Sequence, residues 1–217
     1  MGTAARTAGA IILLATVSSA AYADSPLTST PFHEAYMDLP VINRHVGSVM
    51  NRDIYGILRS EEYPIHVKAA LINAMGWDFG GQSNAALFMF YFMEDTGLDA
   101  VVPEDMTGEE LLLLAYMVSM DDYFTMSPIE TDGEGVLGMS GADLARLAAE
   151  RVPEDFTVRL ISALILSQEA MGHDWGKVFE LCDSVMREDL DRNMRGDAIG
   201  IIMDYISLYY DYSRGIQ

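Results

Sequence analysis

The sequence has a single cysteine, few basic residues and no apolar run long enough to span a bilayer comfortably. Because Cys182 is alone, no internal disulfide can form. The acidic residues beside it raise a thiol pKa rather than lower it. We therefore expect Cys182 to be a small buried side chain and not a nucleophile.

Basic residues are scarce relative to acidic ones. The chain has 13 Lys and Arg residues against 33 Asp and Glu residues, which gives a net charge of -20. Such a charge repels the phosphates of nucleic acids and the headgroups of anionic membranes, and no Lys/Arg cluster offsets it. The composition therefore argues against nucleic acid as a partner.

The patterns of common catalytic and nucleotide-binding sites are also missing. The four histidines are scattered without an HExxH motif or paired Cys/His spacing, no serine stands in a GxSxG elbow, and the glycines form no GxGxxG or Walker motif. We therefore expect no cofactor and favour a non-enzyme. A helical hydrolase that uses carboxylates stays open as an alternative.

Half of the residues are apolar, and 217 residues suffice to bury a core without disulfides or metal. The apolar spacing is helical almost throughout, and strand-like alternation is rare. The sequence therefore predicts an all-α protein of about eight helices, one of which follows a capping box made by Thr107 and Glu110. The expected helices cover about 41–59, 64–75, 83–95, 111–123, 142–150, 155–171, 174–188 and 197–212.

The first 23 residues have the three parts of a secretory signal peptide. Arg6 supplies positive charge, residues 8–20 are apolar and uncharged, and residues 21–23 read Ala-Tyr-Ala, a small-x-small cleavage sequence. We expect the mature chain to begin near Asp24, to be periplasmic or secreted, and to have no transmembrane segment once the signal is removed.

One seven-residue pattern occurs twice. Residues 74–80 read AMGWDFG, and residues 170–176 read AMGHDWG. Each copy joins two expected helices, and an apolar helix that ends in aromatic and acidic residues follows later in both halves. An internal duplication accounts for this shared order and predicts two related three-helix units packed as a helical-repeat-like bundle.

The repeated pattern has a structural interpretation. Gly76 and Gly172 are expected to end their helices in the left-handed conformation. Asp174 is placed to cap the helix that follows, and Asp78 has the same place in its copy. These residues explain the turns without any ligand, although a role beyond structure stays open.

The expected organisation follows from these features. Residues 24–40 hold Ser, Thr and Pro and form an extended lead-in. Residues 41–124 are the first helical unit and residues 143–217 the second. Residues 125–142 are an acidic, glycine-rich linker loop between them.

The linker loop is the one candidate metal site. Glu130, Asp132 and Glu134 alternate before glycines, as oxygen ligands do at the start of a calcium loop. The twelfth residue from Glu130 is Gly141, where an EF-hand has a bidentate Glu. A solvated acidic linker that binds divalent cations weakly is the favoured interpretation, with a calcium-binding module as the alternative.

Tyrosines with helical spacing form the candidate partner groove. Tyr205, Tyr209 and Tyr212 fall on one helix face, and Tyr116 and Tyr123 fall on one face of an earlier helix. Tyrosine suits contact surfaces because its ring is apolar and its hydroxyl tolerates water. Buried packing with the hydroxyls at the rim is the structural alternative.

Together these features predict an exported, acidic, all-helical protein that acts as a non-enzymatic binding or adaptor module. The expected partner is another exported protein with a basic face, because charge complementarity speeds encounter.

Overall fold

The computed structural model describes residues 24–216, and the predicted signal peptide, residues 1–23, lies outside them. The protein is 62 % helical, and no strand occurs in the described part of the chain. The prediction of an all-α protein of about eight helices is confirmed. None of the helices within residues 24–216 combines the length and the apolar character needed to cross a membrane.

The first half begins with short elements and ends in a long buried helix. The single helix expected over 41–59 is wrong. Gly47 has a φ of +70° and donates its N–H to the carbonyl of Ala74 at 2.8 Å, which breaks the helix. Asn51 then caps a new helix by accepting from the N–H groups of Asp53 and Ile54. The helices are α1 (Pro40–Asn43), α2 (Arg52–Arg59), α3 (Ile65–Met75), α4 (Asn84–Thr96) and α5 (Gly108–Asp121).

The second half holds longer helices with a broken C-terminal end. The helix expected over 197–212 is interrupted by a 3-10 turn at Ser207–Tyr209. A 3-10 helix at Phe32–Tyr36 also occupies the segment expected to be an extended lead-in. The helices are α6 (Gly141–Arg151), α7 (Phe156–Ala170), α8 (Trp175–Arg187), α9 (Gly196–Ile206) and α10 (Tyr210–Ser213).

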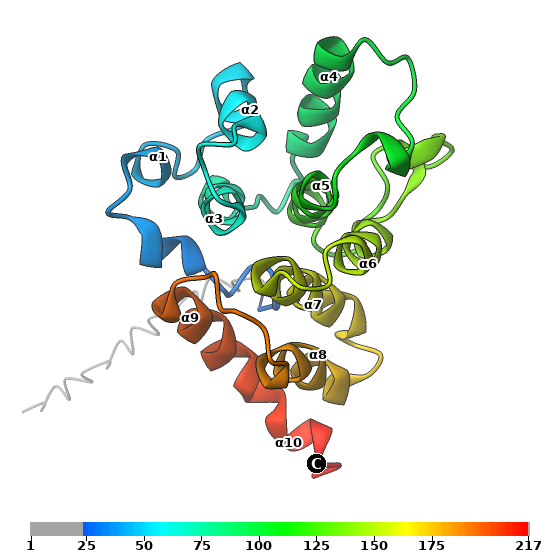
Figure 1. Ribbon diagram of the computed structural model, residues 1–217. Helices are drawn as coiled ribbons and strands as arrows, with labels where there is room; N and C mark the ends of the chain where they lie inside the picture. Colours follow the sequence, from blue (N-terminus) through cyan, green and yellow to red (C-terminus); the bar gives the residue numbers. More distant parts are fainter. Residues whose placement is uncertain (1–23, 217) are drawn as a thin grey trace, which may run out of the picture.

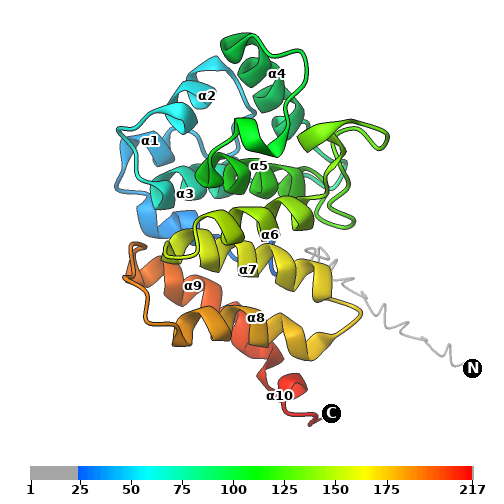
Figure 2. The ribbon, with the colours of Figure 1, turned by 45° about the vertical axis from the view of Figure 1, so that its right-hand side comes forward.

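Successive helices are stacked side by side (Figures 1 and 2). α5 packs on α6, α6 on α7, and α7 on α8, while α3 contacts both α5 and α7. α5 is buried on all sides, since every residue over 111–120 is buried. This explains why its sequence is apolar all round rather than amphipathic.

Arg195, which directly precedes α9, contacts residues in and next to the first 3-10 helix. Its guanidinium forms an ion pair with Asp38, donates to the carbonyl oxygen of Ala35 at 2.7 Å, and lies 4.7 Å from the ring centroid of Tyr36. α9 thereby packs on the first 3-10 helix. The 3-10 helix Phe32–Tyr36 is therefore part of the folded core.

The helix packing does not establish two similar three-helix units. In the first copy of the repeated pattern, α4 packs on α5, whereas in the second copy α8 packs on α7. The buried apolar residues form one continuous cluster that includes both halves. The similarity between the two halves that the sequence suggested is therefore limited to the turns, because the helices around the turns pack differently.

Candidate functional site

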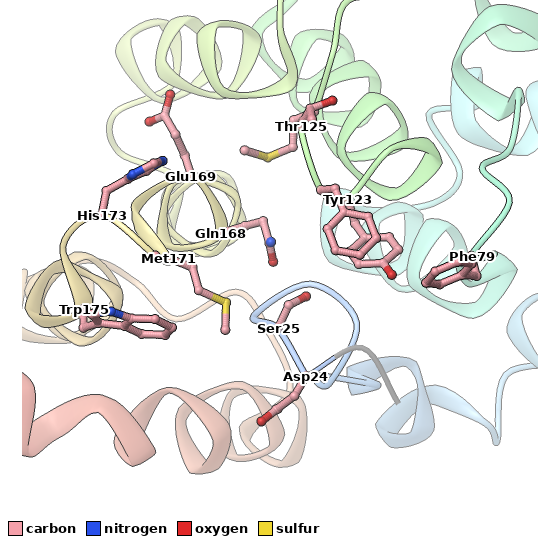
Figure 3. Close-up of a pocket in the computed structure, with 13 residues that line it drawn as sticks. Asp24, Ser25, Phe79, Tyr123, Thr125, Gln168, Glu169, Met171, His173 and Trp175 are labelled. Carbon is pink, nitrogen blue, oxygen red and sulfur yellow. The ribbon is translucent and has the colours of Figure 1, made fainter. Parts of the chain in front are cut away.

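A cavity of about 670 Å³ lies between the two repeated turns (Figure 3). Trp175 lies on one side of it, and Tyr123 and Phe79 lie on the other. Its walls come from the first described residues, the loop after α5, and both turns. We call it the aromatic cavity, and its lining residues are Asp24, Ser25, Phe79, Tyr123, Phe124, Thr125, Met126, Gln168, Glu169, Met171, Gly172, His173 and Trp175.

The first turn follows α3. Gly76 ends the helix with a φ of +80°, which glycine adopts without strain. The carboxylate of Asp78 accepts a hydrogen bond from the N–H of Gly80 at 2.7 Å, so it orders its own loop rather than the next helix. The first turn of α4 is capped instead by Asp121, whose Oδ2 accepts from the N–H of Ala85 at 2.7 Å.

The second turn follows α7 and is shorter. Gly172 has a φ of +87°. Asp174 is the N-cap residue of α8, and its Oδ1 accepts from the N–H of Lys177 at 3.3 Å. The N–H of Asp174 also donates to the carbonyl of Ala170 at 2.9 Å. These bonds fix the direction in which α8 leaves the turn.

In both turns the aromatic residue after the aspartate packs on aromatic residues at the end of a later helix. Phe79 meets Phe124 edge-on, with ring centroids 6.1 Å apart. Trp175 stacks on Tyr209, with centroids 5.8 Å apart and planes within 10°, and lies 6.0 Å from Tyr212. The two copies therefore bring one aromatic cluster each to the aromatic cavity.

Several of these aromatic side chains remain in contact with solvent. Phe79 is 78 % exposed, Phe124 is 66 % exposed and Trp175 is 39 % exposed. Single exposed apolar residues are ordinary, but a group of them around a cavity is typical of a binding surface. Met126 and Met171 add flexible apolar side chains to the same lining.

Carboxylates border the aromatic cavity. Asp24 and Glu169 line it, and Asp78 and Asp122 directly precede the cavity residues Phe79 and Tyr123 in sequence. Of the four carboxylates, only Glu169 takes part in an ion pair within residues 24–216. The border of the cavity therefore carries net negative charge.

The tyrosines predicted to line one groove are not brought together. Tyr116 is wholly buried in the core, where its hydroxyl accepts from Nδ2 of Asn73 at 2.8 Å and burial raises its pKa. The prediction that Tyr116 lines a surface groove is therefore wrong, because α5 has no solvent-facing side at this position. Tyr123 does line the aromatic cavity, and its buried hydroxyl has no hydrogen-bond partner among the described residues.

The C-terminal tyrosines form a cluster behind Trp175. The hydroxyls of Tyr205 and Tyr209 lie 2.9 Å apart, and both side chains are buried. Burial raises the pKa of Tyr205, and the neighbouring Tyr209 hydroxyl and Asp24 carboxylate raise it further. Tyr212 is 45 % exposed and extends the cluster toward solvent.

The acidic linker loop begins at the cavity, where Thr125 and Met126 line it, but its three candidate metal ligands do not belong to the lining. Glu130, Asp132 and Glu134 are exposed. Within residues 24–216, no three His, Cys, Asp or Glu side chains are grouped closely enough to hold a metal ion. Calcium binding by the loop stays a prediction.

Sequence reasoning missed Phe124 and Asp121 as neighbours of the turns. The available signal was the aromatic residue inside each repeated pattern, which required a partner to pack on. Periodicity identified helix faces but gave no information on which helix ends meet in space.

Comparisons of the chain with protein families, with curated proteins and with solved structures give no match.

Proposed function

We propose that the mature chain, residues 24–217, is an exported, non-enzymatic binding protein and that the aromatic cavity is its binding site. The observation that carries this proposal is the convergence of both repeated turns on one cavity bordered by exposed aromatic side chains. The partner is another exported protein with a basic face, because carboxylates border the cavity.

The energetics support a binding role for this surface. Covering a phenylalanine side chain contributes about 1.5–3 kcal/mol relative to leaving it in water. Phe79 and Phe124 are both mostly exposed, so a partner that covers them gains from each. The net charge of -20 adds long-range attraction for a basic partner and weakens with salt.

Affinity capture with matched variants tests the proposal. The mature protein is immobilised, extracytoplasmic extract is applied at low and high salt, and retained species are identified by mass spectrometry. Phe124→Ala removes a cavity side chain, and Phe90→Ala is the control because Phe90 is 60 % exposed on α4 and does not line the cavity.

We expect one partner to be retained at low salt by the wild type and by Phe90→Ala, lost with Phe124→Ala, and released at high salt. Retention of the same species by all three proteins would refute the cavity as the binding site. Retention of nothing specific in either buffer would refute the binding function.

A further inference from the structure

The aromatic cavity has two apolar walls contributed by different turns. Phe79 and Phe124 form one wall, and Trp175 forms the other with Tyr209 stacked behind it. Figure 3 shows Trp175 and Phe79 on opposite sides of the cavity. A ligand that contacts both walls therefore needs two apolar groups rather than one.

Polar side chains lie between the walls. Gln168 and Ser25 occupy the middle of the cavity in Figure 3, and Thr125 lies above them. The Ser25 hydroxyl bonds to Thr28, the Thr125 hydroxyl bonds to Asp122 and Ser127, and Oε1 of Gln168 accepts from the N–H of Leu27 at 3.5 Å. The NH₂ group of Gln168 is the group that suits a backbone C=O of an extended ligand. The arrangement alternates apolar, polar and apolar surface, as the side chains and backbone of a peptide do.

The apolar surface also extends beyond the lining of the cavity. Tyr212 is half-exposed and lies against Trp175, although it does not line the cavity itself. The exposed faces of Phe79 and Phe124 likewise reach solvent. A small molecule held inside the cavity would leave this outer surface uncovered, whereas a peptide that crosses the cavity covers it.

The carboxylates at and near the cavity favour a positively charged ligand. Asp24 lines the cavity and has no ion-pair partner in the described part of the chain, and the same lack of a partner holds for Asp78 and Asp122, which precede the lining residues Phe79 and Tyr123 in sequence. None of the lining residues is Lys or Arg, and Arg146, which is paired with the lining residue Glu169, is also paired with Asp143. Aromatic faces beside carboxylates also favour a cationic group directly.

From these observations we propose that the aromatic cavity binds an extended peptide segment in which two aromatic side chains are flanked by lysine or arginine residues. The inference rests on the proposed binding function and names the chemistry of the partner. The two aromatic side chains occupy the two walls, the backbone crosses the polar middle, and the basic residues face the border carboxylates.

A synthetic peptide provides the probe. Fluorescein-labelled Lys-Phe-Lys-Ser-Lys-Phe-Lys is titrated with the mature protein, and fluorescence anisotropy gives the dissociation constant. Three further peptides replace the first Phe by Ala, the second Phe by Ala, or every Lys by Glu. Phenyltrimethylammonium, added as a competitor, tests whether a small aromatic cation alone accounts for binding.

We expect the two-Phe peptide to bind, each single-Phe peptide to bind about tenfold more weakly, and the Glu peptide not to bind. Raising the salt concentration should weaken binding of the Lys peptide. The single-Phe peptides test the two-wall arrangement without any change to the protein, so the outcome does not depend on a variant that folds poorly.

Protein variants then locate the site. Phe124→Ala should weaken binding about tenfold, and Phe90→Ala should leave it unchanged. Glu169→Gln, which removes a carboxylate from the cavity lining and leaves Arg146 paired with Asp143 alone, should weaken binding several-fold. Its control is Glu94→Gln, because Glu94 is a similarly exposed glutamate paired with an arginine far from the cavity.

The outcomes separate the two proposals. If an extract partner is lost with Phe124→Ala but the Lys–Phe peptide fails to bind, the peptide chemistry is overturned and the binding function stands. If both experiments fail, both proposals are overturned. Competition by phenyltrimethylammonium at concentrations near the peptide dissociation constant, or equal binding of the one-Phe and two-Phe peptides, would overturn the two-anchor peptide in favour of a small organic cation.

Discussion

Asp121 is a buried carboxylate whose titration should be visible in the stability of the whole protein. It is 8 % exposed, its Oδ2 accepts from the N–H of Ala85, and its Oδ1 has no hydrogen-bond partner among the described residues. Burial, partly offset by hydrogen bonds from Ala85 and Asn84, raises the pKa of Asp121 from 3.8 to about 6.

The direction of the effect on stability follows from proton binding. Between about pH 4 and pH 6 the folded protein holds a proton on Asp121 that the unfolded chain has released. The free energy of unfolding therefore falls as the pH rises through this window and becomes constant above it. The difference between the two pKa values corresponds to about 3 kcal/mol at most.

Asp121→Asn removes this titration while it keeps an oxygen that can accept from Ala85. The asparagine side chain is uncharged at every pH, so the free energy of unfolding of the variant should lack the decline between pH 4 and pH 6. At pH 7 it should be more stable than the wild type by about 1–2 kcal/mol, less than the full 3 kcal/mol because the amide NH₂ then lacks a partner where Oδ1 stood.

Urea unfolding followed by circular dichroism, from pH 4.5 to pH 7.5, measures the difference between the two proteins. The control is Asp122→Asn, a neighbouring carboxylate. Burial raises the pKa of Asp122, but hydrogen bonds from Thr125 and Ser127 outweigh it and lower the pKa overall. Its variant should lose stability at pH 7 but keep the decline of the wild type in this window, because Asp121 is still present. A wild type that does not gain stability relative to Asp121→Asn as the pH falls from 6.5 to 4.5 would refute the reasoning.

Three further predictions concern local features. Gly76→Ala and Gly172→Ala should each lower the free energy of unfolding by about 1–2 kcal/mol, because both glycines have positive φ. Gly200→Ala inside α9 should raise it by about 0.5–1 kcal/mol. Urea unfolding measures all three variants. The Cys182 thiol, whose pKa burial raises to about 12, should react with Ellman's reagent only after unfolding; reaction of the native protein at the rate of a free thiol would contradict its burial. Arg195→Ala should cost about 1–3 kcal/mol through loss of its bonds to the N-terminal segment, seen as a lower melting temperature that Arg195→Lys only partly restores.

Short sequence patterns predicted the elements that depend only on residues close together in sequence. The capping box at Thr107 is present, with its hydroxyl accepting from the N–H of Glu110 at 3.2 Å and the Glu110 carboxylate accepting in return at 2.8 Å. The expected helix over 41–59 was wrong because its break at Gly47 depends on a hydrogen bond to the distant Ala74. Contacts of that kind leave no signal in apolar spacing.

The same distinction explains the candidate site. The spacing of Tyr205 and Tyr209 correctly placed their rings together, since their centroids are 5.8 Å apart. Whether such a stripe faces solvent depends on what packs against it, and Trp175 covers this one. Tyr116 does not face solvent at all, because α5 contacts α3, α4, α6 and α7 and every residue over 111–120 is buried.

The repeated turn connects the sequence pattern to the proposed site through geometry rather than through repeat packing. α3 and α7 contact each other, and the turn after each of them contributes lining residues to the aromatic cavity, Phe79 from the first turn and Trp175 with its neighbours from the second. A left-handed glycine in each turn allows the chain to leave the helix sharply, and the aromatic residue that follows is then held at the opening by its packing partner. Because the helices beyond the turns pack differently, shared helix packing does not explain why the pattern recurs. The proposed binding site uses one aromatic residue from each copy of the pattern, Phe79 and Trp175, and the two-anchor peptide tests whether binding requires both.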